Sequence, residues 1–481
     1  MPDANEALVR LVDEVTALKK ELTELRAQLA KRDEENAKLR DALEKSRRSG
    51  KRQAGPFSKG EPKRDPKKPG RKPGEDYGKK ERRRIPETVD AILQASLPSC
   101  CPDCGGGVCE DRVDQQYQTE VPKIEPTVNQ FDVHIGHCVD CGRRLQGRHP
   151  QQTSNALGAA ASQLGPRAQA LATHFQKELG LSFGKAKTLM ASVFGIEVSR
   201  GGLAQAVLRV ADRLEPTHRE IVRQLPQAPV ITPDETGWRV GGHLAWLWVF
   251  EAAESVVYAV LPGRSFKEAT LVLPEEYAGH LVRDGWGPYR SYEFAQHQTC
   301  LNHLLTRCRE LLETAVQGAA RVPHLVRRIL KDALRLRDRR DAGEVSDRGL
   351  QTLAGKLQAR LERLLTWQPT DDENRKLLKH LRHEHELGAV LRFLHVPGLP
   401  ATNHRAEQAI RPAVVNRKVW GGNRTWDGAI AQGTIGTVFG TARRQHRDPV
   451  ELVQEVLRSP VELILPILRG TGPPTSVLLS R

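Results

Sequence analysis

An acidic pair, Asp234-Glu235, stands between two stretches that favour β-structure. Residues 229–232 (PVIT) lead into the pair, a Thr-Gly turn is predicted directly after it, and residues 243–250 (HLAWLWVF) form a very apolar run. This pattern predicts two neighbouring strands with a carboxylate at the end of the first. Carboxylates are rarely buried without a partner, but they are common ligands of divalent cations. The pair is therefore a candidate metal site, and the alternative is an acidic hairpin turn that faces water.

Two further acids in comparable positions favour the metal site. Asp284 ends a short apolar strand predicted at residues 279–284, and Glu407 lies on a helix predicted to begin near Asn403. Two carboxylates at strand ends and one on a helix offer the oxygen-rich, open coordination that Mg²⁺ or Mn²⁺ prefers. Two such ions about 4 Å apart can activate a water, and later a 3′-hydroxyl, while they neutralise charge on a phosphodiester. Glu235 remains the alternative to Asp234 at this stage.

A second kind of metal site is indicated by two C-x-x-C pairs, each followed by glycine and separated by 33 residues. The two-residue spacer lets both thiolates of a turn reach one ion, and the glycine permits a tight turn. Strand-like segments at residues 117–121 and 130–135 predict a zinc-ribbon hairpin. Cys100 and Cys109 are interpreted as bystanders, and His134 or His137 is an alternative to one thiolate. The predicted ligands of a single structural zinc ion are Cys101, Cys104, Cys138 and Cys141.

The basic residues of the chain are concentrated in one segment. The chain has 481 residues, of which 74 are Lys or Arg and 59 are Asp or Glu, and its formal net charge is +15. Residues 46–84 alone hold 16 basic residues against 5 acids, with many prolines and glycines and almost no aliphatic side chains. Such a segment predicts a disordered tether that binds phosphates. Within it, Arg71 and Lys72 lie in PGRKP, which is similar to the basic hooks that enter an A·T minor groove.

The composition argues against membrane-spanning and secreted classes of protein. The longest apolar run, residues 244–250, is far shorter than the roughly 20 residues that cross a bilayer. The N-terminus carries Asp3 and Glu6 and lacks the apolar core of a signal peptide. The 8 cysteines are too few for a secreted disulfide scaffold. We therefore expect a soluble, intracellular protein divided into three or four units.

Residues 1–45 carry a heptad repeat that predicts a coiled-coil oligomerisation helix. Nine of its eleven a and d positions are aliphatic, and the polar Asn36 at an a position favours a fixed register. The alternative is a single helix packed on the body of the protein. The a positions are Leu8, Val15, Leu22, Leu29, Asn36 and Leu43, and the d positions are Leu11, Leu18, Leu25, Arg32 and Leu39. In a parallel dimer the facing charges attract, in the pairs Glu14 with Lys19, Glu21 with Arg26 and Glu35 with Arg40.

The remaining chain predicts a multidomain protein. A zinc-binding module at 85–150 is followed by a helical region at 151–226, in which helices at 183–194 and 201–214 flank a glycine turn. This arrangement is typical of a DNA-binding helix-turn-helix, although many αα-hairpins share it. Strands then indicate an α/β catalytic domain, whose first part is 227–303 and whose second part is 401–460. A basic α-helical insertion occupies 304–400, and 461–481 is a C-terminal tail.

Basic and aromatic residues follow Glu407 closely. Trp420 and Trp426 are interleaved with basic side chains, a composition that suits a nucleic-acid strand. The predicted DNA-binding residues of this stretch are Arg411, Arg417, Lys418 and Arg424. Cys300 and His303, which follow a strand-like run at 297–300, are interpreted as core residues and left out of the catalytic set.

Three contexts together resemble one known family. Asp234 in DETGWRV, Asp284 in LVRDGWGPY and Glu407 in NHRAEQAIRPAVVNRKVW are similar, in this order, to the motifs of the DDE transposases of the insertion sequence 66 family. The likeness extends from the heptad repeat through the cysteine pairs to the C-terminal domain. Two elements depart from the family pattern, since Asn403-His404 stands where a pair of asparagines is usual and Cys300-Leu-Asn-His303 where Cys-Trp-x-His is common.

The resemblance implies a fold, a reaction and partners. It implies an RNase H-like catalytic domain in which Asp234, in preference to Glu235, joins Asp284 and Glu407 to hold two Mg²⁺ or Mn²⁺ ions. Cleavage and joining of double-stranded DNA at element ends and target would follow, in a prokaryotic, nucleoid-associated, cytoplasmic protein that acts with or without accessory proteins of the same element. Two alternatives differ in class: a catalytically silent DNA-binding regulator, which would not need three acids, and a coiled-coil scaffold, which would not explain their contexts.

The cysteine pairs lead to a direct measurement. Protein purified without chelator is expected to contain about one zinc per chain, and exchange of any of the four predicted ligands for serine should remove it. Cys109→Ser is the matched control and should retain the metal. Absence of zinc from the unmodified protein would contradict the assignment.

Overall fold

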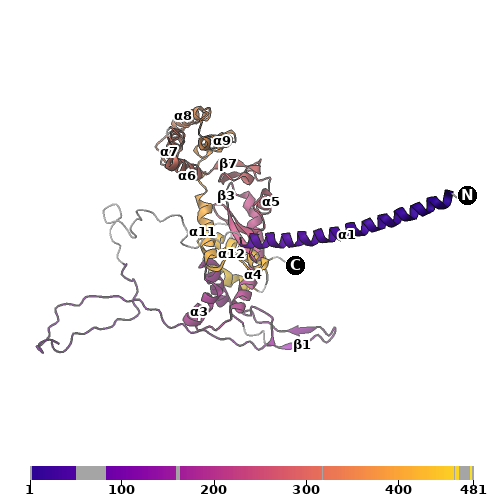
Figure 1. The fold of residues 1–481 in the computed structure, drawn as a ribbon. Coiled ribbons are helices and arrows are strands. Elements are labelled where there is room, and N and C mark those ends of the chain that lie inside the picture. Colours follow the sequence, from indigo (N-terminus) through magenta and orange to yellow (C-terminus); the bar gives the residue numbers. More distant parts are fainter. Residues whose placement is uncertain are drawn as a thin grey trace.

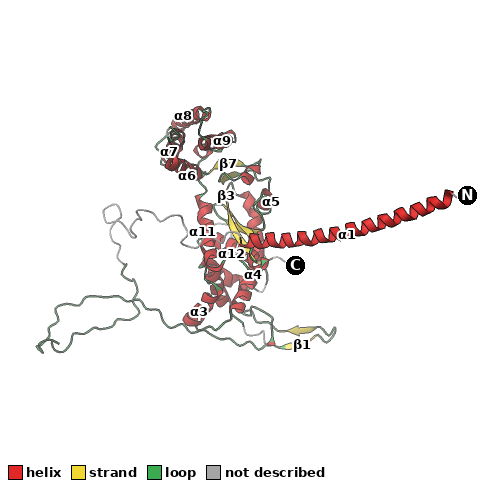
Figure 2. Ribbon diagram, viewed as in Figure 1, coloured by secondary structure: helices red, strands yellow, loops and turns green. Residues whose placement is uncertain are grey.

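A five-stranded mixed sheet lies at the centre of the computed structural model, which describes residues 3–49, 83–158, 163–316, 318–459, 461–464 and 477–478. Helices surround this sheet, and separate helical lobes lie at opposite ends of the body (Figures 1 and 2). The strand order is β5-β4-β3-β6-β7, in which the first three strands are antiparallel and the last two run parallel to β3. The strands are β3 (Val230–Val240), β4 (His243–Glu251), β5 (Val256–Leu261), β6 (His280–Arg283) and β7 (Gln296–Thr299).

Strand β3 is longer than the sequence indicates, and the predicted Thr-Gly turn after the acidic pair is wrong. Thr236 and Gly237 stay within the ladder, opposite Leu247 and Trp246 of β4. The turn lies instead at Gly241-Gly242, whose φ angles of 58° and 85° suit the tight hairpin that glycine pairs favour. Asp234 therefore lies inside β3 rather than at its end, just beyond the part of β3 that pairs with β6.

Different helices pack on the two faces of the sheet. One face packs against α4 (Arg200–Gln224), α12 (Trp426–Arg444) and α13 (Pro449–Arg458), which contribute to a single apolar core with Trp248 and Phe250. The other face, with Trp238 and Val249, packs against α11 (His404–Trp420). Because α4 belongs to this core, the helical region before residue 227 and the sheet fold as one packed body. The short helices α5 (Phe266–Thr270), η4 (Leu225–Gln227) and η5 (Gly287–Ser291) complete the connections.

Helix α12 closes the open edge of the sheet along β5. A Cβ atom on Gly433 would lie 2.9 Å from the Tyr258 carbonyl oxygen, so glycine allows the helix to approach the strand backbone. At this distance the hydroxyls of Thr437 and Thr441 accept hydrogen bonds from the backbone N–H groups of Tyr258 (2.9 Å) and Val256 (3.2 Å). The donors that an edge strand would otherwise leave unpaired are thus satisfied by a helix.

The two helices predicted on either side of the glycine turn are present. α3 (Phe183–Phe194) matches the prediction, ends at Gly195 with a φ of 63°, and is followed by Ser199, whose side chain caps α4. The predicted end of the second helix at Leu214 is wrong, because α4 continues through Pro216 to Gln224 with its inner face buried in the core. Tertiary packing here outweighs the hydrogen bond that proline removes. α2 (Pro166–Thr173) and the π-helical turn η3 (His174–Glu178) precede α3.

The chain between β7 and α11 is helical, and its helices form a core that also takes in Val282 of β6. It is tied to the sheet by an ion pair between Arg283 at the end of β6 and Glu384, at 2.9 Å, with both side chains 0% exposed. The backbone N–H of Thr299 also donates to the carbonyl of Ala389. The insertion comprises α6 (Leu301–Thr314), α7 (Arg321–Asp341), α8 (Asp347–Leu365), α9 (Asp372–Glu386) and α10 (Arg392–His395).

The segment at 83–158 forms extended loops that project from the body (Figure 1). The strands expected at 117–121 and 130–135 are not formed there; β1 (Ile135–His137) and β2 (Arg144–Gln146) instead form a short hairpin around the second cysteine pair. Within the C-terminal tail, β8 (Leu463–Ile464) pairs with β9 (Val477–Leu478). No helix among the described residues is long and apolar enough to span a bilayer.

The predicted N-terminal helix is confirmed as α1 (Asp3–Ser49), which extends four residues into the predicted tether. It projects away from the rest of the chain (Figure 1). Its described aliphatic a and d residues are exposed by 43% to 66%, so the seam has no partner within the described part of this chain. These residues are Val15, Leu18, Leu22, Leu25, Leu29 and Leu39. Pairing with α1 of a second chain would bury them and remains a prediction.

Deletion of residues 1–45 is expected to turn an oligomer into a monomer in light scattering, because it removes the exposed seam. Asn36→Leu should instead tighten association and relax the oligomer number, since it removes the polar residue that fixes the register. Glu24→Gln, which changes an exposed residue outside the a and d positions, serves as the control and should leave the mass unchanged. A deleted protein of unchanged oligomeric state would locate the contact elsewhere.

Candidate active site

The side chains of Asp234 and Glu235 point to opposite faces of the sheet, because consecutive residues of a strand alternate. Asp234 is in phase with Trp238, which packs against α11. Glu235 lies on the other face, where its side chain is 1% exposed and binds Arg264 at 2.6 Å. The hydroxyl of Tyr289 also donates to Glu235. Glu235 is thus held by partners of its own, and Asp234 alone faces the helix that carries Glu407.

Asp284 follows β6 directly and lies beside Asp234 in the parallel part of the sheet. Ile231 of β3 is paired with Leu281 of β6, and both aspartates lie three residues beyond this pair. Asp284 accepts a hydrogen bond from the backbone N–H of Trp286 at 2.9 Å, which holds the loop after β6. The parallel register therefore brings the two aspartates to the same corner of the sheet.

Glu407 reaches this corner from the first turn of α11, and its side chain is 34% exposed. Several contacts fix α11 on the antiparallel strands. The guanidinium of Arg417 donates to the Thr236 hydroxyl at 2.8 Å and to the Gly237 carbonyl, and the Tyr258 hydroxyl donates to the Ala409 carbonyl at 2.7 Å. Helix α11 is therefore anchored on the strand that carries Asp234.

The three carboxylates act on one another electrostatically. Burial, and after it the neighbouring charges of Glu235, Asp284 and Glu407, raise the pKa of Asp234 from 3.8 to about 7. An all-oxygen set of donors under mutual repulsion suits hard divalent cations such as Mg²⁺ and Mn²⁺. The three side chains do not form a group whose ligand atoms all lie within 4.8 Å.

Cys300 and His303 join this site, which the sequence did not indicate. Cys300 is buried, as expected of a core residue, but the side chain of His303 is 50% exposed and its Nε2 lies 3.9 Å from Oε1 of Glu407. A hydrogen bond with Cys300 and electrostatic interaction with the same residue, followed by the charges of Asp284 and Glu407, raise the pKa of His303 to about 9 against the opposing effect of burial. The interpretation of His303 as a core residue is therefore wrong. Its i, i+3 spacing from Cys300 at the start of α6 was the available signal.

The predicted DNA-binding residues have different environments. Arg411, Lys418 and Arg424 are exposed, and the spacing of Arg411 and Lys418 on α11 places them in one stripe with Glu407. Arg417 is half-buried, and its contacts with β3 give it a structural role. Arg71 and Lys72 lie outside the described residues.

The two cysteine pairs each form the expected tight turn. The N–H of Gly105 donates to the Cys101 carbonyl, and the N–H of Gly142 donates to the Cys138 carbonyl, both at 2.9 Å. Hydrogen bonds within each turn lower the pKa of Cys101 and of Cys138. The structure does not bring three of these sulfur atoms together within 4.8 Å. One zinc ion shared by both turns remains a prediction.

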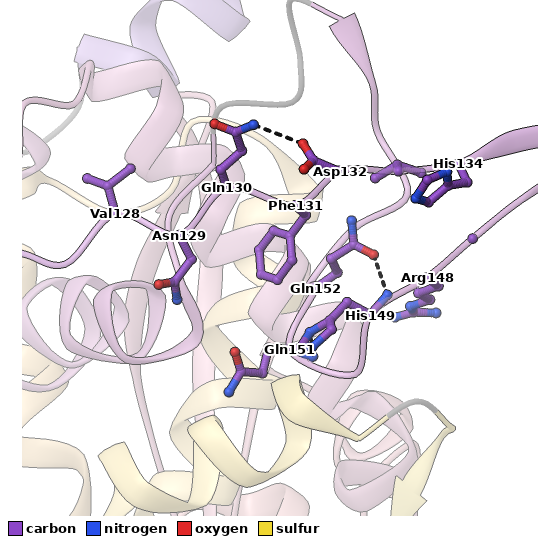
Figure 3. Close-up of a pocket in the computed structure, with 12 residues that line it drawn as sticks. Val128, Asn129, Gln130, Phe131, Asp132, His134, Arg148, His149, Gln151 and Gln152 are labelled. Atoms are coloured by element: carbon purple, nitrogen blue, oxygen red, sulfur yellow. Dashed lines mark hydrogen bonds between the residues drawn. The ribbon is translucent and has the colours of Figure 1, made fainter.

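The structure has two clefts, and one of them lies beside the acids of the sheet. The larger, of about 630 Å³, lies in the 83–158 segment, where Phe131 and His149 face each other at 5.3 Å between ring centres (Figure 3). It does not include the acids of the sheet. The smaller, of about 260 Å³, lies beside them, between the loop after Asp284 and helices α6 and α9. Its lining residues are Gly285, His303, Leu304, Arg307, Lys376, Leu377 and His380.

Comparison with known protein families identifies the part of the chain that carries the three acids. The family model described as Transposase IS66 family matches residues 161–431, which is more than half of the sequence and includes all three acids. No curated protein matches the chain.

The raised pKa of Asp234 predicts an effect of pH on stability. Because the unfolded side chain ionises near 3.8 and the folded one near 7, the folded state is progressively disfavoured as pH rises between these values, by up to about 4 kcal/mol. Asp234→Asn should therefore stabilise the protein in Mg²⁺-free buffer, and more at pH 8 than at pH 5, in urea unfolding. Addition of Mg²⁺ should stabilise the unmodified protein more than the variant. Equal stability of the two proteins at both pH values would contradict this account.

Proposed function

The chain belongs to the IS66 transposase family, and on this basis we propose that it is a DNA transposase of the DDE type, which cuts DNA at the ends of an insertion sequence and joins the freed ends to a target. One observation supports catalysis most directly. Asp234 of β3, Asp284 after β6 and Glu407 of α11 lie near one another, and burial together with the charges of Asp284 and Glu407 raises the pKa of Asp234. An uncompensated group of this kind is costly to maintain unless it binds cations.

The arrangement of strands supports an RNase H-like catalytic domain. Three antiparallel strands are followed by two that run parallel to the first, so the first strand is central. In such a sheet Asp234 lies on β3 and Asp284 directly follows the adjacent parallel strand β6, and α11 brings Glu407 across one face. The helical insertion before α11 places Glu407 far from Asp234 and Asp284 in the sequence but not in the folded structure.

The three acids would hold two Mg²⁺ or Mn²⁺ ions, with Asp234 between Asp284 and Glu407. Bound there, the ions would supply an activated water and neutralise charge on the phosphate under attack. Hydrolysis breaks one phosphodiester bond and leaves a 3′-hydroxyl at the end of the element. In the second step this oxygen attacks a phosphorus of the target and displaces a target 3′-oxygen. One phosphodiester bond forms as another breaks, so the transfer requires no hydrolysis of a nucleoside triphosphate.

Other parts of the chain fit roles in holding DNA. The exposed Arg411 and Lys418 continue the stripe that begins at Glu407 and would orient the strand by contacts with phosphates. Arg424 extends this basic surface beyond the end of α11. The helix-turn-helix of α3 and α4, the zinc module and the basic tether would bind double-stranded DNA, and α1 would pair two copies. Accessory proteins of the same element are possible further partners.

A catalytically silent DNA-binding regulator is the alternative function. It would use the same helices and basic residues but would have no need for three converging carboxylates. Neutralisation of the acids distinguishes the two functions, because it removes activity from an enzyme and leaves a regulator intact.

The neutral variants Asp234→Asn, Asp284→Asn and Glu407→Gln are each expected to reduce Mg²⁺-dependent strand cleavage by at least about 100-fold, while DNA binding in gel shifts persists or improves. Combining two of them should add little further loss, because one missing ligand already disables the pair of ions. Cleavage and binding should be measured side by side on DNA that flanks the encoding gene, with EDTA as the metal-free reference.

Two control variants sharpen this test. Glu276→Gln removes an exposed carboxylate away from the site and should leave cleavage unchanged. Glu235→Gln removes the charged partner of Arg264. This variant should lower the urea midpoint of unfolding and leave the cleavage rate per folded molecule nearly unchanged. Robust cleavage by any of the three acid variants would remove that residue from the site. Loss of cleavage in Glu235→Gln alone would assign the role of Asp234 to its neighbour.

A further inference from the structure

We propose that Cys300, His303 and Glu407 form a second metal site, which takes a thiophilic divalent cation such as Zn²⁺ and, when occupied, withdraws Glu407 from the catalytic acids. One ligand atom of each residue lies within 4.8 Å of the other two, and no other group of three His, Cys, Asp or Glu side chains in the described part of the chain meets this condition. In a tetrahedral zinc site the ligand atoms are about 3.3–3.8 Å apart, so small side-chain rotations suffice to close the site.

The secondary structure presents these three ligands together. Cys300 is the N-cap residue of α6 and His303 lies in its first turn, so the C-x-x-H spacing places both on one side of the helix start. Glu407 occupies the first turn of α11. The backbone N–H of Leu301 donates to the Ala401 carbonyl at 2.9 Å, which joins the start of α6 to the segment before α11. The ligands are therefore carried by two helix starts that the fold already holds together.

The burial of the ligands leaves one side of the site accessible. Cys300 is 0% exposed and forms the floor, whereas the side chains of His303 and Glu407 are 50% and 34% exposed. His303 also lines the cleft of about 260 Å³ between the Asp284 loop, α6 and α9, which provides a route for an ion. Three protein ligands with an open fourth position are typical of zinc sites that exchange a water or substrate.

Asn403 lies against the sulfur atom of Cys300. Its backbone N–H donates to Cys300 Sγ at 3.3 Å, which fixes the sulfur between the starts of the two helices. The side chain of Asn403 is buried, and its amide has no hydrogen-bond partner among the described residues. Unsatisfied buried amides of this kind are often found where a ligand completes a site.

The types of ligand separate this site from the catalytic one. Sulfur and imidazole nitrogen select Zn²⁺ and other borderline cations, while Mg²⁺ binds carboxylate oxygen and retains its waters. Glu407 is the one residue common to both sites. This consequence depends on the function proposed above, whereas the binding of metal by Cys300 and His303 does not. Zinc is thus expected to inhibit Mg²⁺-dependent cleavage by competing for a shared ligand.

Metal binding can be tested without any measurement of activity. Full-length protein is loaded with Co²⁺ under reducing conditions, and the bound metal and the thiolate-to-cobalt charge-transfer absorption are measured per chain. The unmodified protein should bind about one equivalent more than Cys300→Ser or His303→Gln, because each variant lacks a ligand. The zinc-module cysteines contribute equally to every variant. Cys308→Ala, which changes another buried cysteine of α6 outside the group, should match the unmodified protein.

The effect on cleavage is measured as the ratio of rates with and without Zn²⁺ at fixed Mg²⁺. This ratio should fall at least about tenfold in the unmodified protein and in Cys308→Ala, and stay near one in Cys300→Ser. Equal Co²⁺ binding by all variants would overturn the site and leave the three residues as a hydrogen-bonded contact between α6 and α11. Inhibition by zinc that persists in Cys300→Ser would overturn the sharing of Glu407. Absence of cleavage from every protein would refute the proposed function, while the Co²⁺ measurement would still decide the site.

Discussion

The alternation of side chains along β3 is the constraint on which the site depends. Because Asp234 faces α11, Glu235 must face the opposite core, where Arg264 and Tyr289 neutralise and satisfy it. The charge of Glu235 is therefore balanced within the protein, whereas Asp234 has no such basic partner among the described residues on its face of the sheet. A shift of one residue in the register with β4 would exchange the two, and the Gly241-Gly242 hairpin prevents this shift.

Sequence patterns predicted correctly those helices and strands whose ends are determined by neighbouring residues in the sequence. The helix at Phe183–Phe194 agrees with the prediction to the residue, because apolar periodicity and a glycine turn define it. The end of β3 was wrong because two glycine-containing turns competed, and cross-strand pairing with β4 decided between them. The extension of α4 beyond Pro216 buries Thr217 and Ile221, and the Thr217 hydroxyl donates to the Leu463 carbonyl, which is remote in sequence and leaves no local signal.

The candidate site was predictable in part for the same reason. The three acids stand in recognisable sequence contexts, so they could be singled out from the sequence, although Asp234 lies inside β3 and not at the predicted strand end. The role of Arg417 could not be inferred, because its acceptor Thr236 is 181 residues away, and neither could the contact of His303 with Glu407 on a distant helix. The cysteine turns form locally, but nothing in their spacing shows how the two turns would meet.

The ion pair between Arg283 and Glu384 has a consequence for the evolution of the chain. The helical insertion has its own core, and such a lobe would ordinarily be exchangeable between related proteins by recombination at its two ends. Here exchange would leave a buried guanidinium next to Asp284 without its carboxylate, a loss of about 3–5 kcal/mol for broken buried pairs. A viable chimera would have to inherit strand β6 and helix α9 from the same parent. The lobe is thus separate in sequence, but this ion pair and the packing of Val282 of β6 in its core tie it to the sheet.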